Sequence, residues 1–335
     1  MSTPERAPDI ATALAHGFDV DLALLNLGDE AGRGGQGRVQ RLDGYPGLLL
    51  KHYLDPGKVN GRALTELVAL RHGLPAADRD RLDAQTAWPL CRVVDGPRCV
   101  GFLMREAPPA MTWLTGAGAR KLTEAQYLLY PPRAATQGVL RPDPEQRLAL
   151  LLEVVGLVGR LHRRGLVIGD LSHANVLWTV RPEPAVYLLD CDGIRRIGAA
   201  PVLEQADTPD WADPLSPHGS AATVDSDRYK AALLIGRTLA QDPYLTPGQP
   251  FEPLPGVLAD RSAAMVRRVW EQAGGAYGTR PDLHTWRAAL EGRDAIALTP
   301  PGAVPPRPSQ PPRPVDPRLF DGRAARGSIR LNRPS

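Results

Sequence analysis

Asp170 and Asn175 lie five residues apart in the run GDLSHAN, and Asp190 follows fifteen residues later in LLDCDG, after an apolar stretch. Phosphoryl transfer from a nucleotide asks little covalent chemistry of a protein: a carboxylate orients the attacking hydroxyl, and oxygen ligands hold Mg²⁺ against the phosphates. Asp170 suits the first task, and Asn175 with Asp190 suits the second. The types and spacing of these residues therefore predict a phosphoryl-transfer site.

A glycine-rich segment precedes these residues in the chain. Residues 32–39, GRGGQGRV, fit the pattern G-x-G-x-x-G-x-V, in which the missing side chains let backbone N–H groups approach phosphates closely. The pattern alone is weak, because glycine-rich turns are common and the chain has 33 glycines. Lys51 follows at the end of the apolar run PGLLL, which favours a buried strand that presents one cation.

Glu66 lies fifteen residues beyond Lys51 in ALTELVALRH, a segment with helical apolar spacing. A helix here places Glu66 against Lys51, or else Glu66 is a solvated charge on an exposed face, which is the commoner situation for acidic residues. The occurrence of five such signals in a workable order favours the paired arrangement.

Together these residues resemble the protein kinase superfamily, specifically the bacterial eukaryotic-like Ser/Thr kinases. The resemblance covers roughly residues 20 to 293. Beyond Asp190, residues 208–214 (TPDWADP) resemble the end of an activation segment. Residues 225–235 (DSDRYKAALLI) resemble the helix that begins with a buried aspartate holding the catalytic loop, and Arg280 resembles the closing arginine of the large lobe.

The resemblance implies an α+β, two-lobed protein kinase-like fold with a nucleotide between the lobes. It predicts a small β-rich N-lobe with one main helix over residues 20–105 and a larger, mainly helical C-lobe over residues 106–293. Residues 1–19 are expected to form an N-terminal extension, and residues 294–335 a disordered tail rich in Pro and Arg.

The resemblance also implies roles for individual residues. Lys51 contacts the α- and β-phosphates of ATP and pairs with Glu66, while Asp170 is the catalytic base. Asn175 and Asp190 bind Mg²⁺, with Mn²⁺ as an alternative ion, and Thr208 lines the acceptor site. The adenine-reading hinge is formed by residues 104–107. The residues implied to contact the nucleotide are Gly32, Gly34, Gly35, Gly37, Val39, Leu49, Lys51, Met104, Glu106 and Leu177.

Several positions depart from the family pattern. Ser172 stands where a lysine near the γ-phosphate is usual, which predicts slow transfer or more ATP hydrolysis. Cys191 replaces a phenylalanine, and Asp192, which follows it, is a second carboxylate able to approach a metal. The strand leading into Asp190 favours Asp190 as the ligand. Leu49 replaces an alanine and is expected to crowd the adenine.

Two more departures concern control of the site. The triplet ending at Asp170 reads IGD and lacks the arginine that pairs with a phosphorylated activation loop, which argues against switching by that route. Residues 212–214 read ADP in place of Ala-Pro-Glu, so Asp213 is expected to substitute as the partner of Arg280.

The resulting functional hypothesis is an ATP- and Mg²⁺-dependent protein Ser/Thr kinase. Two alternatives stay open: a nucleotide-binding pseudokinase scaffold, which the departures favour, and a small-molecule phosphotransferase. The substrate is expected to be a protein. The segments WPL at residues 88–90 and GFLM at 101–104 resemble a soluble bacterial subset often found with PP2C-type phosphatases and von Willebrand A-type proteins, which are therefore candidate partners.

Composition agrees with a two-lobed catalytic unit plus a tail, since the chain has 335 residues, of which 43% are hydrophobic. The most apolar stretch, residues 148–158, is interrupted by Glu153 and is too short to span a bilayer. The N-terminus carries no basic region followed by an apolar core, which predicts no secretory signal and a cytoplasmic location.

The three cysteines lack metal-binding spacing, and Cys191 is best interpreted as a small core residue. The last 40 residues hold 10 of the 35 prolines and seven arginines against two aspartates, so the positive balance lies in the tail. Phe320 is the only aromatic residue there, so nucleic-acid binding is not expected. The insert at residues 108–142, beside the site, is expected to shape acceptor binding or to pack over the large lobe.

Overall fold

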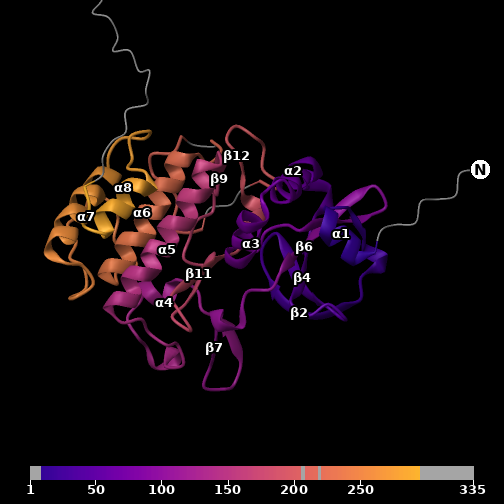
Figure 1. Cartoon of the computed structure of the whole chain (residues 1–335), viewed down its shortest axis with the longest axis horizontal. Helices are drawn as coiled ribbons and strands as arrows, with labels where there is room; N and C mark the ends of the chain where they lie inside the picture. Colours follow the sequence, from indigo (N-terminus) through magenta and orange to yellow (C-terminus); the bar gives the residue numbers. More distant parts are fainter. Residues whose placement is uncertain (1–8, 205–207, 218–219, 295–335) are drawn as a thin grey trace, which may run out of the picture. The chain divides into compact units, whose positions relative to one another are not determined.

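The computed structural model describes residues 9–204, 208–217 and 220–294. These residues form an α+β structure with a six-stranded sheet, three two-stranded sheets and eight α-helices. Figure 1 shows the strands of the large sheet gathered at one side and helices α5 to α8 at the other, with α3 and β11 between them. The expected tail, apart from residue 294, lies outside the described residues. No helix in the described part of the chain has the length and apolar character that a membrane crossing requires.

The six-stranded sheet has the order β1-β5-β6-β4-β3-β2. Its neighbouring strands are antiparallel, except that β1 runs parallel to β5. The strands are Val20–Asp21 (β1), Leu27–Arg33 (β2), Gly37–Leu42 (β3), Leu48–Tyr53 (β4), Cys91–Asp95 (β5) and Arg98–Arg105 (β6).

The two faces of β4 contact different cores. Side chains alternate along a strand, so Leu49, Lys51 and Tyr53 share one face and Leu50 points to the other. Leu50 belongs to a small core with Ile10, whereas Leu49 and Tyr53 belong to the main core. This alternation places Lys51 on the face of β4 that contacts the main core.

Two α-helices lie within residues 20–105, where one main helix was expected, and a third precedes them in the expected N-terminal extension. They are Ile10–His16 (α1), Gly61–His72 (α2) and Ala76–Gln85 (α3). The strongly charged sequence of α3 does not indicate how the helix packs. Its buried residue is Asp83 rather than an apolar side chain. Asp83 accepts a bidentate pair of bonds from Arg71 of α2 (2.7 and 2.6 Å) and further bonds from Arg105 at the end of β6 (3.2 Å).

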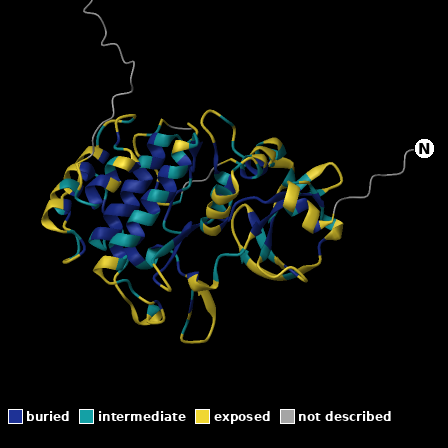
Figure 2. Cartoon of the chain, in the orientation of Figure 1, coloured by how far each residue is buried: buried dark blue, intermediate teal, exposed yellow. Residues whose placement is uncertain are grey.

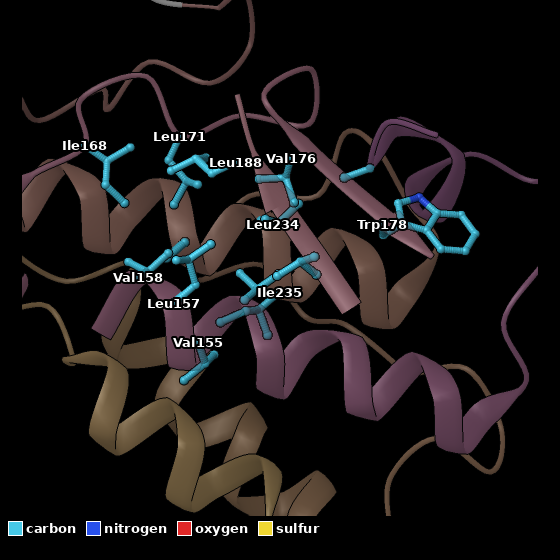
Figure 3. Packing of buried hydrophobic residues seen from close by; sticks show 14 of the residues in the cluster. Val155, Leu157, Val158, Ile168, Leu171, Val176, Trp178, Leu188, Leu234 and Ile235 are labelled. Carbon is cyan, nitrogen blue, oxygen red and sulfur yellow. The ribbon is translucent and has the colours of Figure 1, made fainter. Parts of the chain in front are cut away.

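The remaining helices build the C-terminal part around α6, which is almost wholly buried (Figure 2). Helix α5 begins at a capping box between Asp143 and Gln146, with a proline in its first turn, a favourable start for a helix. Figure 3 shows Val155 and Val158 of α5 lying close to Leu234 and Ile235 of α6. The helices are Gln126–Leu129 (α4), Pro144–Arg163 (α5), Val224–Ala240 (α6), Asp260–Ala273 (α7) and Leu283–Leu290 (α8).

Three short strand pairs lie after residue 111. They are Thr112–Leu114 (β7) with Arg120–Leu122 (β8), Leu166–Val167 (β9) with Arg195–Arg196 (β12), and Val176–Thr179 (β10) with Ala185–Leu188 (β11). The first pair falls in the insert, where Trp113 packs edge-on against Tyr127, with ring centroids 5.5 Å apart. The other two pairs hold the loop 168–175 and the turn 189–193 next to each other.

Candidate active site

A cavity of about 240 Å³ lies where four distant segments of the chain meet. Its lining includes residues 34–37 of the turn between β2 and β3, Lys51 of β4, Asp170 of the loop 168–175, and Asp190 and Asp192 of the turn 189–193. The sequence therefore predicted correctly that the glycine-rich segment, Lys51, Asp170 and Asp190 share one place.

Asp170 and Asn175 are joined within their loop. The Asn175 amide nitrogen donates to the Asp170 carboxylate (Oδ2, 2.9 Å) and to the Asp170 carbonyl (2.9 Å). The carbonyl of Asn175 accepts from the backbone N–H of Leu189 (2.8 Å), which places Asn175 beside the residue before Asp190. The Asn175 nitrogen is thus engaged by Asp170, which leaves the amide oxygen as the group able to bind a cation. Asn175 itself is buried and is not among the residues that line the cavity.

Asp190 and Asp192 occupy different environments despite being two residues apart. The Asp190 side chain is 59% exposed, whereas that of Asp192 is 4% exposed. Asp190 has φ 51° and ψ 42°, a left-handed conformation that non-glycine residues rarely adopt and that often marks a functional site. This conformation and the short helix at residues 191–193 leave Asp190 open to the cavity and turn Asp192 inward.

Lys51 forms two ion pairs across the cavity. Its Nζ lies 2.7 Å from Asp192 Oδ1 and 3.2 Å from Asp190 Oδ1. Burial lowers the pKa of the Lys51 ammonium, but the two carboxylates, Asp192 before Asp190, outweigh burial and hold that pKa above its ordinary value. Lys51 is therefore a protonated cation at neutral pH and can bind an anion.

The expectation that Lys51 pairs with Glu66 is wrong. Glu66 is exposed and contacts Arg62 at 3.5 Å on its own helix. The buried stripe of α2 consists of Leu64, Leu67, Val68 and Arg71. At about 100° per residue, Glu66 falls on roughly the opposite side of α2 from that stripe. Turning Glu66 inward would expose these apolar side chains.

The loop that carries Asp170 is held by hydrogen bonds to Asp227 of α6. The Asp227 carboxylate, which is fully buried, accepts from the backbone N–H groups of Ile168 (2.6 Å) and Gly169 (2.8 Å) and contacts His162 Nε2 (3.1 Å). Lys230, one turn along α6, donates to the carbonyl of Gly169 (2.7 Å). The prediction of a buried aspartate that holds this loop is confirmed.

The four glycines of residues 32–37, from the end of β2 to the start of β3, fall into two groups. A Cβ atom added at Gly32, Gly34 or Gly35 would meet nothing within 4 Å, and their φ angles are not in the left-handed region. A Cβ at Gly37 would lie 2.9 Å from the carbonyl oxygen of His52 in β4. Packing thus explains glycine at position 37 only. Gly34 and Gly35 line the cavity without a side chain to fill it, whereas Gly32, also expected to contact the nucleotide, does not line it.

Segment 202–204 contributes Leu203 to the lining of the cavity and is held by two hydrogen bonds. The Gln36 amide donates to the carbonyl of Glu204 (2.9 Å), and the backbone N–H of Asn60 donates to the carbonyl of Val202 (2.8 Å). Leu203, between these two anchors, lines the cavity. Residues 205–207, which follow, lie outside the described residues.

This cavity is not lined by four of the residues expected to contact the nucleotide: Leu49, Met104, Glu106 and Leu177. Leu49 and Met104, paired across β4 and β6, are 8% and 7% exposed, and Leu177 of β10 is fully buried. The Glu106 side chain contacts Arg41 (2.7 Å) on the surface. Val39 does line the cavity. The open space thus covers the predicted phosphate side, and the predicted adenine side is filled by core side chains.

The acceptor side of Asp170 is occupied by Thr208. Its hydroxyl donates to Asp170 Oδ1 (2.9 Å) and contacts the Ser172 hydroxyl (3.1 Å). Ser172 is fully buried. Among the described residues that line the cavity, Lys51 supplies the one positive charge. Ser172, which replaces a lysine usual in the family that the sequence resembles, thus forms a pair of hydroxyls with Thr208.

Segment 208–214 is anchored to the helical part through Trp211 and Asp213. Trp211 stacks on His173 (centroids 5.3 Å apart) and lies under the Arg237 guanidinium at 4.9 Å. Asp213 pairs with Arg280 at 2.6 Å, so the predicted substitution of Asp213 in this contact is confirmed. The segment is thereby fixed beside Asp170.

Cys191 is a core residue, as the sequence indicated. Its side chain is fully buried in the main core. Burial, followed by the Asp192 and Asp190 carboxylates, raises the pKa of this thiol well above its ordinary value. Cys191 is therefore a poor nucleophile, because the reactive form of cysteine is the thiolate.

The site is completed by one residue that sequence reasoning missed, Tyr53, and one whose pairing it did not predict, Asp192. Tyr53 donates from its hydroxyl to Asp192 Oδ2 (3.1 Å), and burial, followed by Asp192, raises its pKa. Its position two residues after Lys51 in one strand was the available signal. Asp192, considered as an approach to metal, is instead the buried partner of Lys51.

The described residues contain no ready-made cage of three or more His, Cys, Asp or Glu side chains. Mg²⁺ at a nucleotide needs none, because one or two protein ligands usually share it with phosphates and water. The chain matches no protein-family model and no curated protein sequence. The chemistry of the cavity must therefore be inferred from its own side chains.

Proposed function

We propose that this chain is an ATP- and Mg²⁺-dependent protein kinase that transfers the γ-phosphate of ATP to serine or threonine hydroxyls. One observation carries the proposal: an open glycine turn, a protonated lysine and two aspartates converge on one cavity from four separate segments. That combination supplies backbone donors and a cation for phosphates, a carboxylate for a metal and a carboxylate for an acceptor hydroxyl.

The nucleotide phosphates would lie beneath the turn at residues 34–37, where no Cβ obstructs them. Lys51 would meet the phosphate oxygens with its ammonium group. Asp190, exposed to the cavity, and the Asn175 amide oxygen are the groups suited to hold Mg²⁺, which neutralises phosphate charge when bound. This assignment favours Asp190 over Asp192, whose carboxylate is already engaged by Lys51 and Tyr53.

Asp170 would orient the acceptor hydroxyl and accept its proton. Its two carboxylate oxygens already accept from Asn175 and Thr208, which fixes their direction. The Thr208 hydroxyl, which donates to this carboxylate at 2.9 Å, supports the proposal as an example of an aliphatic hydroxyl in that position. A serine or threonine side chain has the same donor group.

A protein acceptor is favoured by the surroundings of Asp170. Segment 208–214 lies beside it and is fixed by the Trp211 and Asp213 contacts, which makes a firm platform for an extended chain. In this proposal the strand-bearing part, residues 20–105, and the helical part, residues 106–293, are the two lobes of a protein kinase-like fold.

A nucleotide-binding pseudokinase is the second candidate. It is favoured by the hydroxyl pair of Ser172 and Thr208, which stands where transfer would benefit from a cation. It is also favoured by Leu49 and Met104, which fill the predicted adenine side.

Intact-protein mass spectrometry after incubation with ATP and Mg²⁺ separates the two candidates. A kinase gains the mass of one or more phosphates, on itself or on an added protein mixture, and Asp170→Asn does not. Binding of ATP without any mass gain on the chain, a protein mixture or a metabolite panel would favour the pseudokinase. Transfer to metabolites alone would indicate a small-molecule phosphotransferase.

A further inference from the structure

Lys51 pairs with a buried carboxylate, that of Asp192. Lys51 is 6% exposed and Asp192 is 3% exposed, and their side chains meet at 2.7 Å. A buried charge pair of this kind is stable only when its remaining hydrogen-bonding capacity is also satisfied. The Tyr53 hydroxyl meets that need, because it donates to the second oxygen of Asp192.

Asp190 is less suited to fix Lys51. Its contact with Lys51 is longer, at 3.2 Å, and its side chain is mostly exposed to the cavity. A carboxylate that binds Mg²⁺ must also be free to turn toward the ion. Lys51 therefore has a close and buried partner, Asp192, and a more distant and exposed partner, Asp190.

Helix α2 is fixed by contacts that have nothing to do with Lys51. Arg71 pairs with Asp83 of α3, and the Trp88 indole donates to the carbonyl of Leu67 (2.9 Å). Both contacts lie on the buried stripe and set the rotation of α2 with Glu66 outward. Bringing Glu66 to Lys51 would require both of them to break.

We propose that Asp192, rather than Glu66, is the positioning residue that aims Lys51 at the nucleotide phosphates, with Tyr53 bracing it. The assignment rests on the proposed nucleotide site. It makes the site independent of α2: the cation is held by residues of β4 and the turn 189–193 alone. A shift of α2 then leaves nucleotide binding unchanged.

A double-mutant cycle in thermal unfolding tests the pair without any nucleotide. Lys51→Met and Asp192→Asn are made singly and together, and Lys51→Met is combined with Glu66→Gln as the matched control. We expect the first double variant to unfold several degrees above the midpoint that adding the single shifts gives. The control pair should be additive. Additive behaviour of Lys51 with Asp192, or coupling of Lys51 with Glu66, would overturn the pairing.

Calorimetric titration with Mg·ATP tests the positioning role. Asp192→Asn should weaken binding by about tenfold or more, since a misdirected ammonium loses charge-assisted hydrogen bonds to phosphate. In the Lys51→Met background the same change should have no further effect, which a merely structural role would not produce. Glu66→Gln should bind Mg·ATP as the parent does. Equal losses in Glu66→Gln and Asp192→Asn would show that α2 turns inward when nucleotide binds, contrary to the proposal.

Tyr53→Phe keeps the test decisive if Asp192→Asn does not fold. It removes the brace on Asp192 without changing any charge, so we expect a smaller loss of Mg·ATP affinity that disappears in the Lys51→Met background. Persistence of the loss in that background would overturn the proposal. If the parent chain bound no Mg·ATP at all, the proposed function would fail, whereas the unfolding cycle would still report on the Lys51–Asp192 pair.

Discussion

Arg280 and Asp213 form a bidentate ion pair in which both side chains are 1% exposed. Nη1 of Arg280 lies 2.6 Å from Oδ2 of Asp213, and Nη2 lies 2.7 Å from Oδ1. Arg280 also contacts Asp225 at the start of α6, at 2.6 Å. One guanidinium thus ties segment 208–214 to the helix that supports the loop 168–175.

Removing one partner of this pair should be costly. Asp213→Ala is expected to lower the free energy of unfolding by about 3 kcal/mol, the low end for breaking a buried pair, because Asp225 still balances the guanidinium. Urea denaturation measures this change. The matched control is Asp294→Ala in the exposed Arg261–Asp294 pair, which should cost less than about 1 kcal/mol. Equal effects of the two changes would contradict the role given to burial.

Asp227→Asn should loosen the loop that carries Asp170. The substitution replaces an acceptor of two backbone N–H bonds with a group that is partly a donor, so we expect a loss of about 1–3 kcal/mol in unfolding free energy. Phosphate transfer should slow more than Mg·ATP affinity falls, since Lys51 and Asp190 lie outside this loop. Comparison of kcat with the Mg·ATP dissociation constant checks this, and an unchanged kcat would rule out the supporting role.

The two groups of glycines should respond differently to alanine. Gly35→Ala has room for its Cβ and is expected to leave the unfolding free energy unchanged or to raise it by up to about 1 kcal/mol, while weakening Mg·ATP binding. Gly37→Ala places its Cβ against the carbonyl of His52 and should destabilise the fold. Thermal unfolding and nucleotide titration of both variants distinguish the groups. Full Mg·ATP affinity in Gly35→Ala would show that the open space is not a phosphate site.

Substitutions of Asp170 and Asp190 should have different effects, the first on the rate of phosphate transfer and the second on metal-dependent binding of ATP. Asp170→Asn is expected to bind Mg·ATP normally and to lose transfer by about 10²-fold to 10⁴-fold, the usual contribution of a general base. Asp190→Asn should weaken binding of ATP in the presence of Mg²⁺ but not in its absence. Single-turnover transfer and titration with and without Mg²⁺ measure the two effects. Parent-like transfer by both variants would show that the roles are misassigned.

Thiol reactivity should follow burial. Cys191 and Cys91 are fully buried, and burial raises the pKa of Cys91 to about 12 and that of Cys191 well above its ordinary value. Cys99 is only partly buried, although burial raises its pKa too. Because the thiolate is the reactive form, N-ethylmaleimide at pH 8 should modify the folded protein at Cys99 first and the others only on unfolding. Mass spectrometry of the native and Cys99→Ser proteins checks this, and rapid modification of Cys191 would show that the turn 189–193 opens.

The parts of the site that follow local sequence rules were predictable. The spacing of Asp170, Asn175 and Asp190 indicated that they share one site, and the apolar run before Lys51 indicated a buried strand that presents this cation. The pairing of Asp213 with Arg280 was also predicted, although from the resemblance of residues 212–214 to Ala-Pro-Glu of the protein kinase family rather than from a local rule.

The parts that depend on tertiary packing were not predictable by the same rules. The apolar spacing of α2 predicted a helix, but the outward direction of Glu66 depends on which stripe the core selects. Asp83 ties the charged and mostly exposed segment 76–85 to Arg71 and Arg105, through contacts that no periodicity reveals. Burial of Leu177 likewise results from strand pairing in the helical part rather than from its own neighbours.

The contacts of Gln36 with Glu204 and of Asn60 with Val202 have a kinetic consequence. These two hydrogen bonds join the strand-bearing part of the chain to an irregular backbone segment on one side of the cavity. The cavity cannot widen on that side unless both bonds break. We therefore expect opening on this side to require the displacement of a short stretch of loop that includes Leu203, while the sheet and the helices stay intact.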